Sequence, residues 1–369
     1  MDGLYIHIPF CLSKCPYCDF YSTIPKDDAI SLYCAAAADE MTAGRRTGDF
    51  TKNSDLAFDT VYFGGGTPSI IGADNIGFLL NRARKSYSVS DNAEITVECN
   101  PSSVNEDFFK ALSFFGVNRI SLGLQSAVDG ERKALGRKAG RTQVENAVNW
   151  ARKAGIDNIS LDIMLGIPNQ TESSLNETID FCLNTGTPHI SAYMLTIEEN
   201  TVFYKRRDKL NLPDEDSVCD MYLKVCDRLK ARGLERYEIS NFAISGFESK
   251  HNLKYWRCEE YLGLGASAHS FISGKRFFTS RDFRGFIAGE KAVFDSLGGS
   301  EEEFIMLRLR LKSGLTNDDY REKFGCDIPK SLFEKAKTFS AEYVTVSDNS
   351  VSLTDKGALI SNYIIGSLI

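Results

Sequence analysis

The sequence predicts an α/β protein, in which six βα units form an open barrel and a small α+β domain with a winged-helix pattern follows. In the first 200 residues, short β-rich runs alternate with helical runs, which is typical of a parallel sheet covered by helices. From about residue 299, three helical runs precede a hairpin, and 369 residues are enough for both parts. We expect the barrel at 1–235, a linking segment at 236–298 and the C-terminal domain at 299–369.

The barrel strands are expected where short apolar, β-branched and aromatic runs lie between turn residues. They are Leu4–Ile8, Thr60–Phe63, Glu94–Glu98, Asn118–Leu122, Asn158–Met164 and His189–Leu195. The helical runs between them are Ala29–Thr42, Asp74–Tyr87, Asn105–Phe115, Thr142–Ala154 and Ser173–Asn184. Parallel strands place their active sites in the loops at their carboxyl ends.

The alternation stops after about residue 200. There we expect a helix at Asp214–Arg232, a strand at Arg236–Phe242 and a loop-rich segment through Gly274. In the C-terminal domain we expect helices at Glu301–Leu311, Thr316–Phe324 and Lys330–Phe339, then a hairpin of Tyr343–Val346 and Ser350–Leu353.

The charge and composition exclude several classes of partner. A net charge of −7 leaves no basic surplus to neutralise phosphates, so we expect no nucleic-acid partner, and the winged-helix pattern favours a cap or docking role. No secretory segment and no run of 18 apolar residues is found, so the expected location is the cytoplasm, with membrane contact only through partners. The sequence leaves open whether the protein forms a homodimer.

Three cysteines near the N-terminus, Cys11, Cys15 and Cys18, have the spacing C-x3-C-x2-C. A structural zinc site or an electron-transfer [4Fe–4S] cluster needs four ligands, and the next cysteine, Cys34, lies in a helical run. A zinc site would have to borrow one of only four histidines from elsewhere in the chain. We therefore favour a four-iron cluster held by three thiolates, which keeps one iron open for a substrate or cofactor.

This cysteine spacing resembles the signature of the radical S-adenosylmethionine (SAM) superfamily, whose fold is a partial TIM barrel. The resemblance implies that the open iron chelates the amino and carboxylate groups of SAM, and that Tyr17 packs near its adenine. It also assigns the turn at Gly64–Thr67 to the methionine end of SAM. Glycines there let the backbone approach a ligand closely.

Other candidate SAM contacts lie at the ends of later strands. Glu98 could accept hydrogen bonds from the cationic ligand, Arg137 could pair with its carboxylate, and Asp162 could hold the ribose. Each of these residues, taken alone, would more commonly form a salt bridge at the rim of the barrel. As a set, they suit a zwitterionic ligand that carries a ribose. The complete predicted SAM set is Tyr5, Tyr17, Phe20, Gly64, Gly65, Gly66, Thr67, Glu98, Gln125, Arg137 and Asp162. No catalytic residue is predicted.

Three longer segments, Leu4–Cys11, Tyr62–Ser69 and Arg119–Ser126, resemble the oxygen-independent coproporphyrinogen III oxidase group. The resemblance to this group covers essentially the whole chain. The oxidase branch of that group carries a fourth cysteine two residues after the third, where this chain has Phe20. That branch also has an N-terminal extension, for which the ten residues before Cys11 leave no room.

The other branch consists of heme chaperones, and its mark is an H-N-x-x-Y-W motif. Here His251-Asn252-Leu253-Lys254-Tyr255-Trp256 fits that motif, and Tyr261–Ser270 also resembles the branch. A neutral imidazole is a common ligand of heme iron, so His251 is the predicted ligand, with Tyr255 and Trp256 as flat apolar faces for the porphyrin. Since His251 lies outside the six βα units, we expect its loss to spare the fold.

The resemblance implies a chaperone that binds heme, a [4Fe–4S] cluster and SAM, and delivers heme to apoproteins such as membrane-bound respiratory enzymes. The alternative is an enzyme that uses a 5′-deoxyadenosyl radical to decarboxylate coproporphyrinogen III oxidatively. The missing fourth cysteine argues against the enzyme, and the H-N-x-x-Y-W motif favours the chaperone. A winged-helix regulator is disfavoured by the acidic charge.

Overall fold

The computed structural model describes residues 1–44, 46–51 and 56–369, and it confirms the predicted α/β fold. All six predicted barrel strands form, most of them longer than expected. They are β1 (Asp2–Ile8), β2 (Ala57–Gly65), β3 (Ser88–Cys99), β4 (Arg119–Gln125), β5 (Asn158–Leu165) and β6 (His189–Met194). Each pairs with the next in parallel, as six consecutive βα units require.

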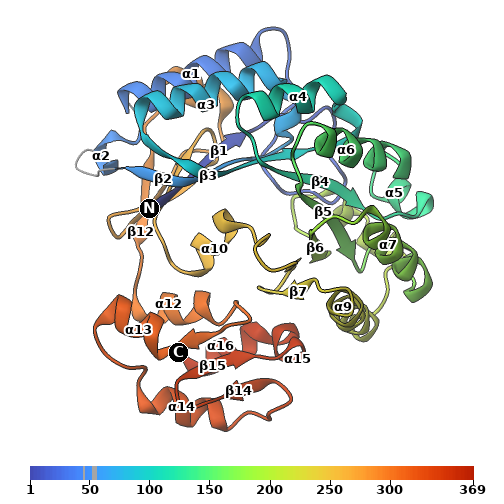
Figure 1. Ribbon diagram of the computed structural model, residues 1–369, viewed down its shortest axis with the longest axis vertical. Coiled ribbons are helices and arrows are strands. Elements are labelled where there is room, and N and C mark those ends of the chain that lie inside the picture. Colours follow the sequence, from blue (N-terminus) through green and yellow to red (C-terminus); the bar gives the residue numbers. More distant parts are fainter. Residues whose placement is uncertain (45, 52–55) are drawn as a thin grey trace.

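The main helices lie on the outside of this curved sheet (Figure 1). They are α1 (Ala29–Ala43), α3 (Ala73–Ser86), α4 (Glu106–Phe114), α6 (Arg141–Lys153), α7 (Glu172–Thr185) and α9 (Glu215–Lys230). Side-chain oxygens of Asn105, Thr171 and Asp214 accept hydrogen bonds from the first turns of α4, α7 and α9. The shorter helices α2 (Gly48–Thr51), α5 (Asp129–Ala134) and α8 (Val202–Lys205) lie in the connections.

Polar and aliphatic residues alternate along the barrel strands. The aliphatic positions, such as Ile6, Val97 and Leu122, are buried in the main hydrophobic core. The alternate positions are polar or aromatic and meet one another inside the barrel: Tyr5, His7, Tyr62, Glu94, Glu98, Arg119, Ser121, Ser160, Asp162, His189 and Ser191. Successive side chains of a strand point to opposite faces. The helices therefore cover an aliphatic face, while the inside of the barrel is polar.

The sheet is larger than the sequence predicts. Its order is β12-β11-β10-β9-β1-β2-β3-β4-β5-β6-β8-β7, so antiparallel strands extend both edges of the barrel. The predicted strand Arg236–Phe242 is wrong as one element, because it is split into β7 (Glu235–Arg236) and β8 (Asn241–Ala243), which pair with each other. These strands are too short to show an alternating pattern in the sequence.

The predicted loop-rich segment through Gly274 is also corrected. It contains α10 (Lys250–Trp256), β9 (Tyr261–Leu264) and β10 (His269–Ile272), followed by β11 (Lys275–Phe278), α11 (Phe283–Ala288) and β12 (Val293–Leu297). Strand β9 pairs in parallel with β1, on the edge of β1 opposite to β2. The barrel strands therefore gain a parallel neighbour from a distant part of the sequence. The glycines and serines of this segment are not typical of strands, so its composition does not predict them. Local composition also cannot reveal a distant pairing partner.

The C-terminal part has the expected winged-helix pattern. Helices α12 (Glu301–Arg308), α13 (Asn317–Phe324) and α14 (Lys330–Lys337) precede the hairpin of β14 (Val344–Val346) and β15 (Ser350–Leu353). The sequence did not predict β13 (Leu315–Thr316), which pairs with β15, or the last helices α15 (Asp355–Leu359) and α16 (Ser361–Leu368). Its buried residues form most of a second core, which also includes Cys258 and Phe271 from the preceding segment, and the boundaries at 235 and 298 stay a prediction.

The C-terminal part docks below the barrel, next to α10 and β7 (Figure 1). The buried guanidinium of Arg236 donates to Asp355 at 2.6 Å and to the carbonyl of Leu353 at 3.1 Å. The backbone amide of Lys312 donates to the carbonyl of Tyr237 at 3.0 Å. These contacts fix the C-terminal part against the edge strands of the sheet.

We predict that Arg236→Ala lowers the free energy of unfolding by about 2–4 kcal/mol, because it leaves polar partners unpaired at a buried contact. The measurement is urea denaturation followed by circular dichroism. The matched control is Lys312→Ala, which removes an exposed ion pair with Glu235 and should cost at most about 1 kcal/mol. Equal losses in the two variants would contradict this account of the docking.

Candidate functional site

The three predicted cluster ligands lie on the loop that follows β1. This loop is closed at its base, since the amide of Thr23 donates to the carbonyl of Pro9 at 2.7 Å and that of Cys11 to the carbonyl of Thr23 at 3.0 Å. The amide of Cys18 donates to the carbonyl of Cys15 at 3.1 Å, which folds the second half of the loop back on itself. All three thiols are half-buried and free.

The residues around these thiols fit an iron–sulfur cluster better than a single metal ion. Among the described residues, no three His, Cys, Asp or Glu side chains lie close enough together to hold one ion. In a four-iron cluster, each cysteine binds a different iron, so its thiolates need not converge on one point. The guanidinium of Arg137 lies 3.9 Å from the sulfur of Cys15, where it can offset negative charge on the thiolate. The donor set therefore suits the predicted cluster.

The glycine turn after β2 is packed against the cysteine loop. The amide of Gly66 donates to the carbonyl of Ile8 at 2.9 Å, and that of Thr67 to the carbonyl of Phe10 at 2.8 Å. A Cβ at Gly65 would lie 2.5 Å from the His7 ring, and φ is +113° there. Glycine is therefore required at position 65 by the fold itself, because a larger residue would have to displace the His7 ring from the barrel interior. The hydroxyl of Thr67 lies 3.4 Å from the sulfur of Cys11.

Two half-buried acids lie on β3 and β5, Glu98 next to the last residue of β3 and Asp162 in the middle of β5. Glu98 accepts a hydrogen bond from the Tyr62 hydroxyl at 2.8 Å, and Asp162 accepts one from Ser121 at 2.9 Å. Burial raises the pKa of Glu98 to about 7 and that of Asp162 to about 6. A cationic ligand would stabilise both carboxylates in their charged form. These acids are thus prepared to bind positive charge.

Arg137 and Gln125 converge beside β4. Arg137 donates to the carbonyl of Gly123 at 2.9 Å, and a Cβ at Gly123 would lie 2.3 Å from the Arg137 guanidinium and 3.0 Å from the amide nitrogen of Gln125. Gln125 has a left-handed backbone, with φ +68°, at a register shift between β4 and β5. The structure therefore brings this amide and this cation to one place at the strand ends.

The aromatic members of the predicted SAM set lie in different environments. The Tyr5 hydroxyl shares a hydrogen bond with His7 at 3.0 Å inside the barrel, Tyr17 packs on Phe203 at 6.2 Å, and Phe20 is 69% exposed. Sequence reasoning missed Tyr62 and Ser121, which hold the two acids. The alternation along the strands could have shown them, because Tyr62 lies two residues before the predicted Gly64 and Ser121 lies four residues before the predicted Gln125, on the same faces of their strands.

The predicted heme ligand His251 lies inside the barrel, near the amino ends of β1 and β2. Its Nδ1 shares a hydrogen bond with the Thr60 hydroxyl at 2.8 Å, and its Nε2 shares one with the Tyr255 hydroxyl at 2.8 Å. The ring is 1% exposed and stacks on Tyr62 at 5.1 Å. The burial of His251 argues against the expectation that its loss would spare the fold, because α10 packs against β1 and β2 at the floor of the barrel. Iron ligation by His251 stays a prediction, and it requires the ligating ring nitrogen to give up its hydrogen bond.

The other two motif residues contact different neighbours. The ring of Tyr255 packs edge-on against Tyr261 at 4.6 Å, while the guanidinium of Arg310 lies 5.1 Å from the centre of the Trp256 ring. The backbone amides of Lys250 and His251 both donate to Glu94 at 3.1 Å, which ties the start of α10 to β3. In this arrangement, the three side chains do not form one flat surface for a porphyrin.

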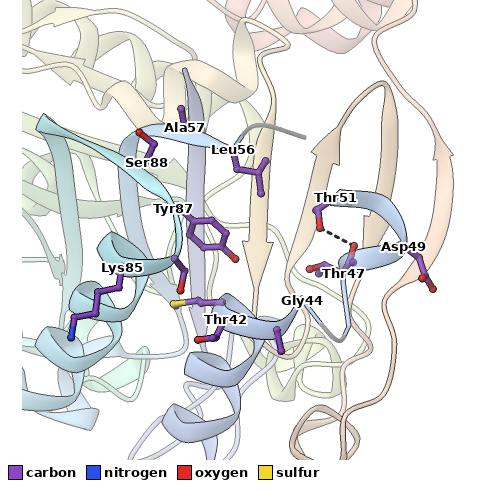
Figure 2. Close-up of a pocket in the computed structure, with 14 residues that line it drawn as sticks. Thr42, Gly44, Thr47, Asp49, Thr51, Leu56, Ala57, Lys85, Tyr87 and Ser88 are labelled. Atoms are coloured by element: carbon purple, nitrogen blue, oxygen red, sulfur yellow. Dashed lines mark hydrogen bonds between the residues drawn. The ribbon is translucent and has the colours of Figure 1, made fainter. Parts of the chain in front are cut away.

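A separate surface hollow of about 930 Å³ lies between the end of α1, α2 and the starts of β2 and β3 (Figure 2). Its described lining includes Thr42, Thr47, Lys85 and Tyr87. It therefore lies at the amino ends of the parallel strands, away from the cysteine loop. Parallel sheets place their active sites at the carboxyl ends, so this hollow is not the candidate site.

Comparison with protein families agrees with the site. A sequence model of the radical SAM superfamily matches residues 5–182, from β1 into α7, and a model of the HemN C-terminal domain matches residues 302–360. The coproporphyrinogen III oxidase HemN from Escherichia coli has a similar structure, with a TM-score of 0.82 over 99% of this chain and 89% of that chain, at 20% identity. That likeness shows the fold alone. The fold and the site define a radical SAM protein, and that superfamily implies a [4Fe–4S] cluster and SAM.

Relatives with curated names narrow this class. The heme chaperone HemW from Bacillus subtilis is 34% identical over 100% of this chain and 99% of its own length. The proteins of the same name from Lactococcus lactis and Escherichia coli are each 33% identical over 98% of this chain, and over 95% and 97% of their own lengths. The chain belongs to the HemW family.

We predict that SAM affinity rises with pH through about 7 and then levels off. Below its pKa, Glu98 is protonated and cannot balance a cationic ligand; above it, the carboxylate is charged and affinity is constant. Calorimetric titrations of the cluster-loaded protein between about pH 5.5 and 8.5 measure this step. Glu98→Gln should weaken binding and flatten the step, whereas the surface control Glu172→Gln should keep it. An unchanged step in Glu98→Gln would remove this carboxylate from the site.

We predict that His251→Ala lowers the free energy of unfolding by about 3 kcal/mol, because it leaves a cavity and two unpaired hydroxyls in the barrel floor. The control is His269→Ala, which removes the one exposed imidazole and should cost less than about 0.5 kcal/mol. Urea denaturation of both variants without cofactors measures the difference. A His251→Ala variant as stable as the control would show that α10 does not close the floor.

Proposed function

We propose that this protein is a heme chaperone, which binds heme and delivers it to apoproteins. The observation that carries the proposal is identity of 33–34% over nearly the full length with proteins named heme chaperone, including both the barrel and the C-terminal part. Likeness in fold to the oxidase is weaker support for porphyrin decarboxylation, since one fold carries many functions.

In this proposal, Cys11, Cys15 and Cys18 hold a [4Fe–4S] cluster with one exchangeable iron, which would supply reducing chemistry to bound SAM. The glycine turn at Gly64–Thr67 would border the methionine end. Its fit is supported by the hydrogen bonds that fix the turn against the cysteine loop. The remaining predicted SAM contacts would surround the ligand at the strand ends, where Arg137 already meets the cysteine loop at Cys15.

The carboxylates would place the ligand by charge. Glu98 and Asp162 are half-buried, so a cationic group beside them gains more than it would in water. Tyr62 and Ser121 donate to these two carboxylates and keep them in position. Arg137 offers the opposite charge for a carboxylate of the same ligand. This distribution of charge suits a zwitterion and supports SAM as the ligand.

The acceptors in this proposal are apoproteins such as membrane-bound respiratory enzymes, and the protein acts in the cytoplasm, meeting a membrane only through them. Within the described part of the chain, every helix is too short or too polar to cross a lipid bilayer. We expect no nucleic-acid partner, since the chain carries a net charge of −7.

The test compares two activities of the anaerobically reconstituted protein. We expect transfer of heme to an apo-cytochrome acceptor, measured by the acceptor's absorption spectrum, and no conversion of coproporphyrinogen III with SAM and a reductant. The oxidase from Escherichia coli serves as positive control for the second assay. Turnover of coproporphyrinogen III without heme transfer would show that the protein is an oxidase and not a chaperone.

We predict that changing any one of Cys11, Cys15 and Cys18 to Ala removes most of the about four irons bound per chain after reconstitution. Iron analysis and the visible absorption of the cluster are the measurements. Cys34→Ala, in the buried face of α1, and Cys326→Ala, on the surface, are the controls and should keep the iron. If Cys34→Ala lost as much iron as Cys15→Ala, the assignment of three ligands would be wrong.

A further inference from the structure

The inner face of the sheet continues beyond the barrel onto β9, β10 and β11. Strand β9 lies beside β1 with Gly3 opposite Tyr261 and Tyr5 opposite Gly263, so Tyr261 shares the inner face with Tyr5. In β10, Phe271 is opposite Tyr261, which puts His269, two residues earlier, on this same face. His269 in turn is opposite Phe278 of β11. We call this extension of the inner face, formed by β9, β10 and β11, the shelf; it continues the inner face of the barrel beyond β1.

His269 differs from the other histidines of the chain. His7, His189 and His251 are at most 4% exposed, and each has both ring nitrogens in hydrogen bonds. His269 is exposed, and within the described residues nothing is hydrogen-bonded to its ring. It is thus the imidazole that can bind a metal ion without breaking a contact of the fold.

The surroundings of His269 combine a flat apolar surface with positive charge. Its ring stacks on Phe278, with centroids 5.4 Å apart and planes at 26°, and the exposed side chain of Val293 is paired opposite Phe278. Burial of part of the ring lowers the pKa of His269, and Arg281 and Arg276 lower it further while Asp295 opposes them. The ring is therefore neutral near pH 7, the form in which imidazole binds metals.

This shelf is fixed to the cysteine loop. Arg281 lies 3.7 Å from Asp19, and the amide of Phe283 donates to the Tyr21 hydroxyl at 2.8 Å. Between those two loop residues lies Phe20, which is 69% exposed, an unusual position for a large apolar side chain. A flat apolar ligand on His269 would therefore lie next to the loop that carries the three cysteines.

We propose that heme binds on this shelf, with a ring nitrogen of His269 as axial ligand of the iron. The inference rests on the proposed function and names the heme site of that function. In ferric heme, the imidazole lone pair would form the iron–nitrogen bond in place of a water ligand, with no change in oxidation state. Phe278 and the exposed Val293 opposite it offer apolar contact to the macrocycle, and the 63% exposed side chain of Arg281 offers a partner for a propionate.

This site avoids the obstacle at the H-N-x-x-Y-W motif. There, His251 is 1% exposed, so its ligating nitrogen would have to give up a hydrogen bond and the packing around its ring would have to open before it could meet iron. The motif then has a structural role, since it closes the barrel floor and ties the C-terminal part to the sheet. Heme on the shelf needs neither of these contacts to open.

The test is titration of ferric hemin into the full-length, cluster-loaded protein, followed by the Soret band and resonance Raman spectroscopy. In His269→Ala we expect loss of the histidine-ligated spectrum and at least a tenfold weaker affinity, with iron content, SAM binding and melting temperature unchanged. His269→Met should restore an axial ligand with a shifted band. Arg281→Ala should weaken binding several-fold without changing the ligand signature. Phe114→Ala, on the outer surface of α4, controls for nonspecific adsorption of hemin.

The possible results distinguish a wrong heme site from a wrong proposed function. A histidine-ligated spectrum retained in His269→Ala but lost in a folded His251→Gln variant would overturn the shelf and leave the chaperone function standing. A spectrum unchanged in both variants would also overturn it. If the parent protein neither binds hemin nor transfers it, the proposed function fails, and the heme site fails with it.

Discussion

One buried positive charge, the guanidinium of Arg119, lies among the polar and acidic side chains inside the barrel. Burial alone would lower the pKa of this side chain, but neighbouring groups including Glu94 and Asp162 raise it, so it stays charged. Glu94 in turn accepts the first amides of α10, and Asp162 lies at the candidate ligand site. An unpaired charge in this place would be costly, so the surrounding acids cannot change independently.

The polar interior explains how two distant parts of the chain act as one unit. Helix α10 follows the barrel in sequence, yet His251 completes the interior by bonding to Thr60 and stacking on Tyr62. The same Tyr62 donates to Glu98 at the other end of the strand. The barrel floor and the candidate site therefore share one side chain, and a change in the floor would reach that site through packed contacts.

The extended sheet gives the cysteine loop a second support. On one side, the loop contacts the turn after β2 and Arg137; on the other, Asp19 and Tyr21 contact the segment after β11. The loop that carries the three predicted cluster ligands has few internal hydrogen bonds of its own. Its shape is therefore set by neighbours that are far away in sequence. Because Asp19 and Tyr21 contact the segment after β11, heme on the proposed shelf would lie beside this loop.

The sequence by itself determined the βα alternation, the three-cysteine loop, the glycine turn and the winged-helix pattern, because each is a local signal of spacing or periodicity. Sequence could not show that β9 pairs with β1, since strands of four residues acquire their partners only through tertiary packing. Nor could it separate His251 from His269. Both stand in segments that resemble one family, and only the fold buries the first and exposes the second.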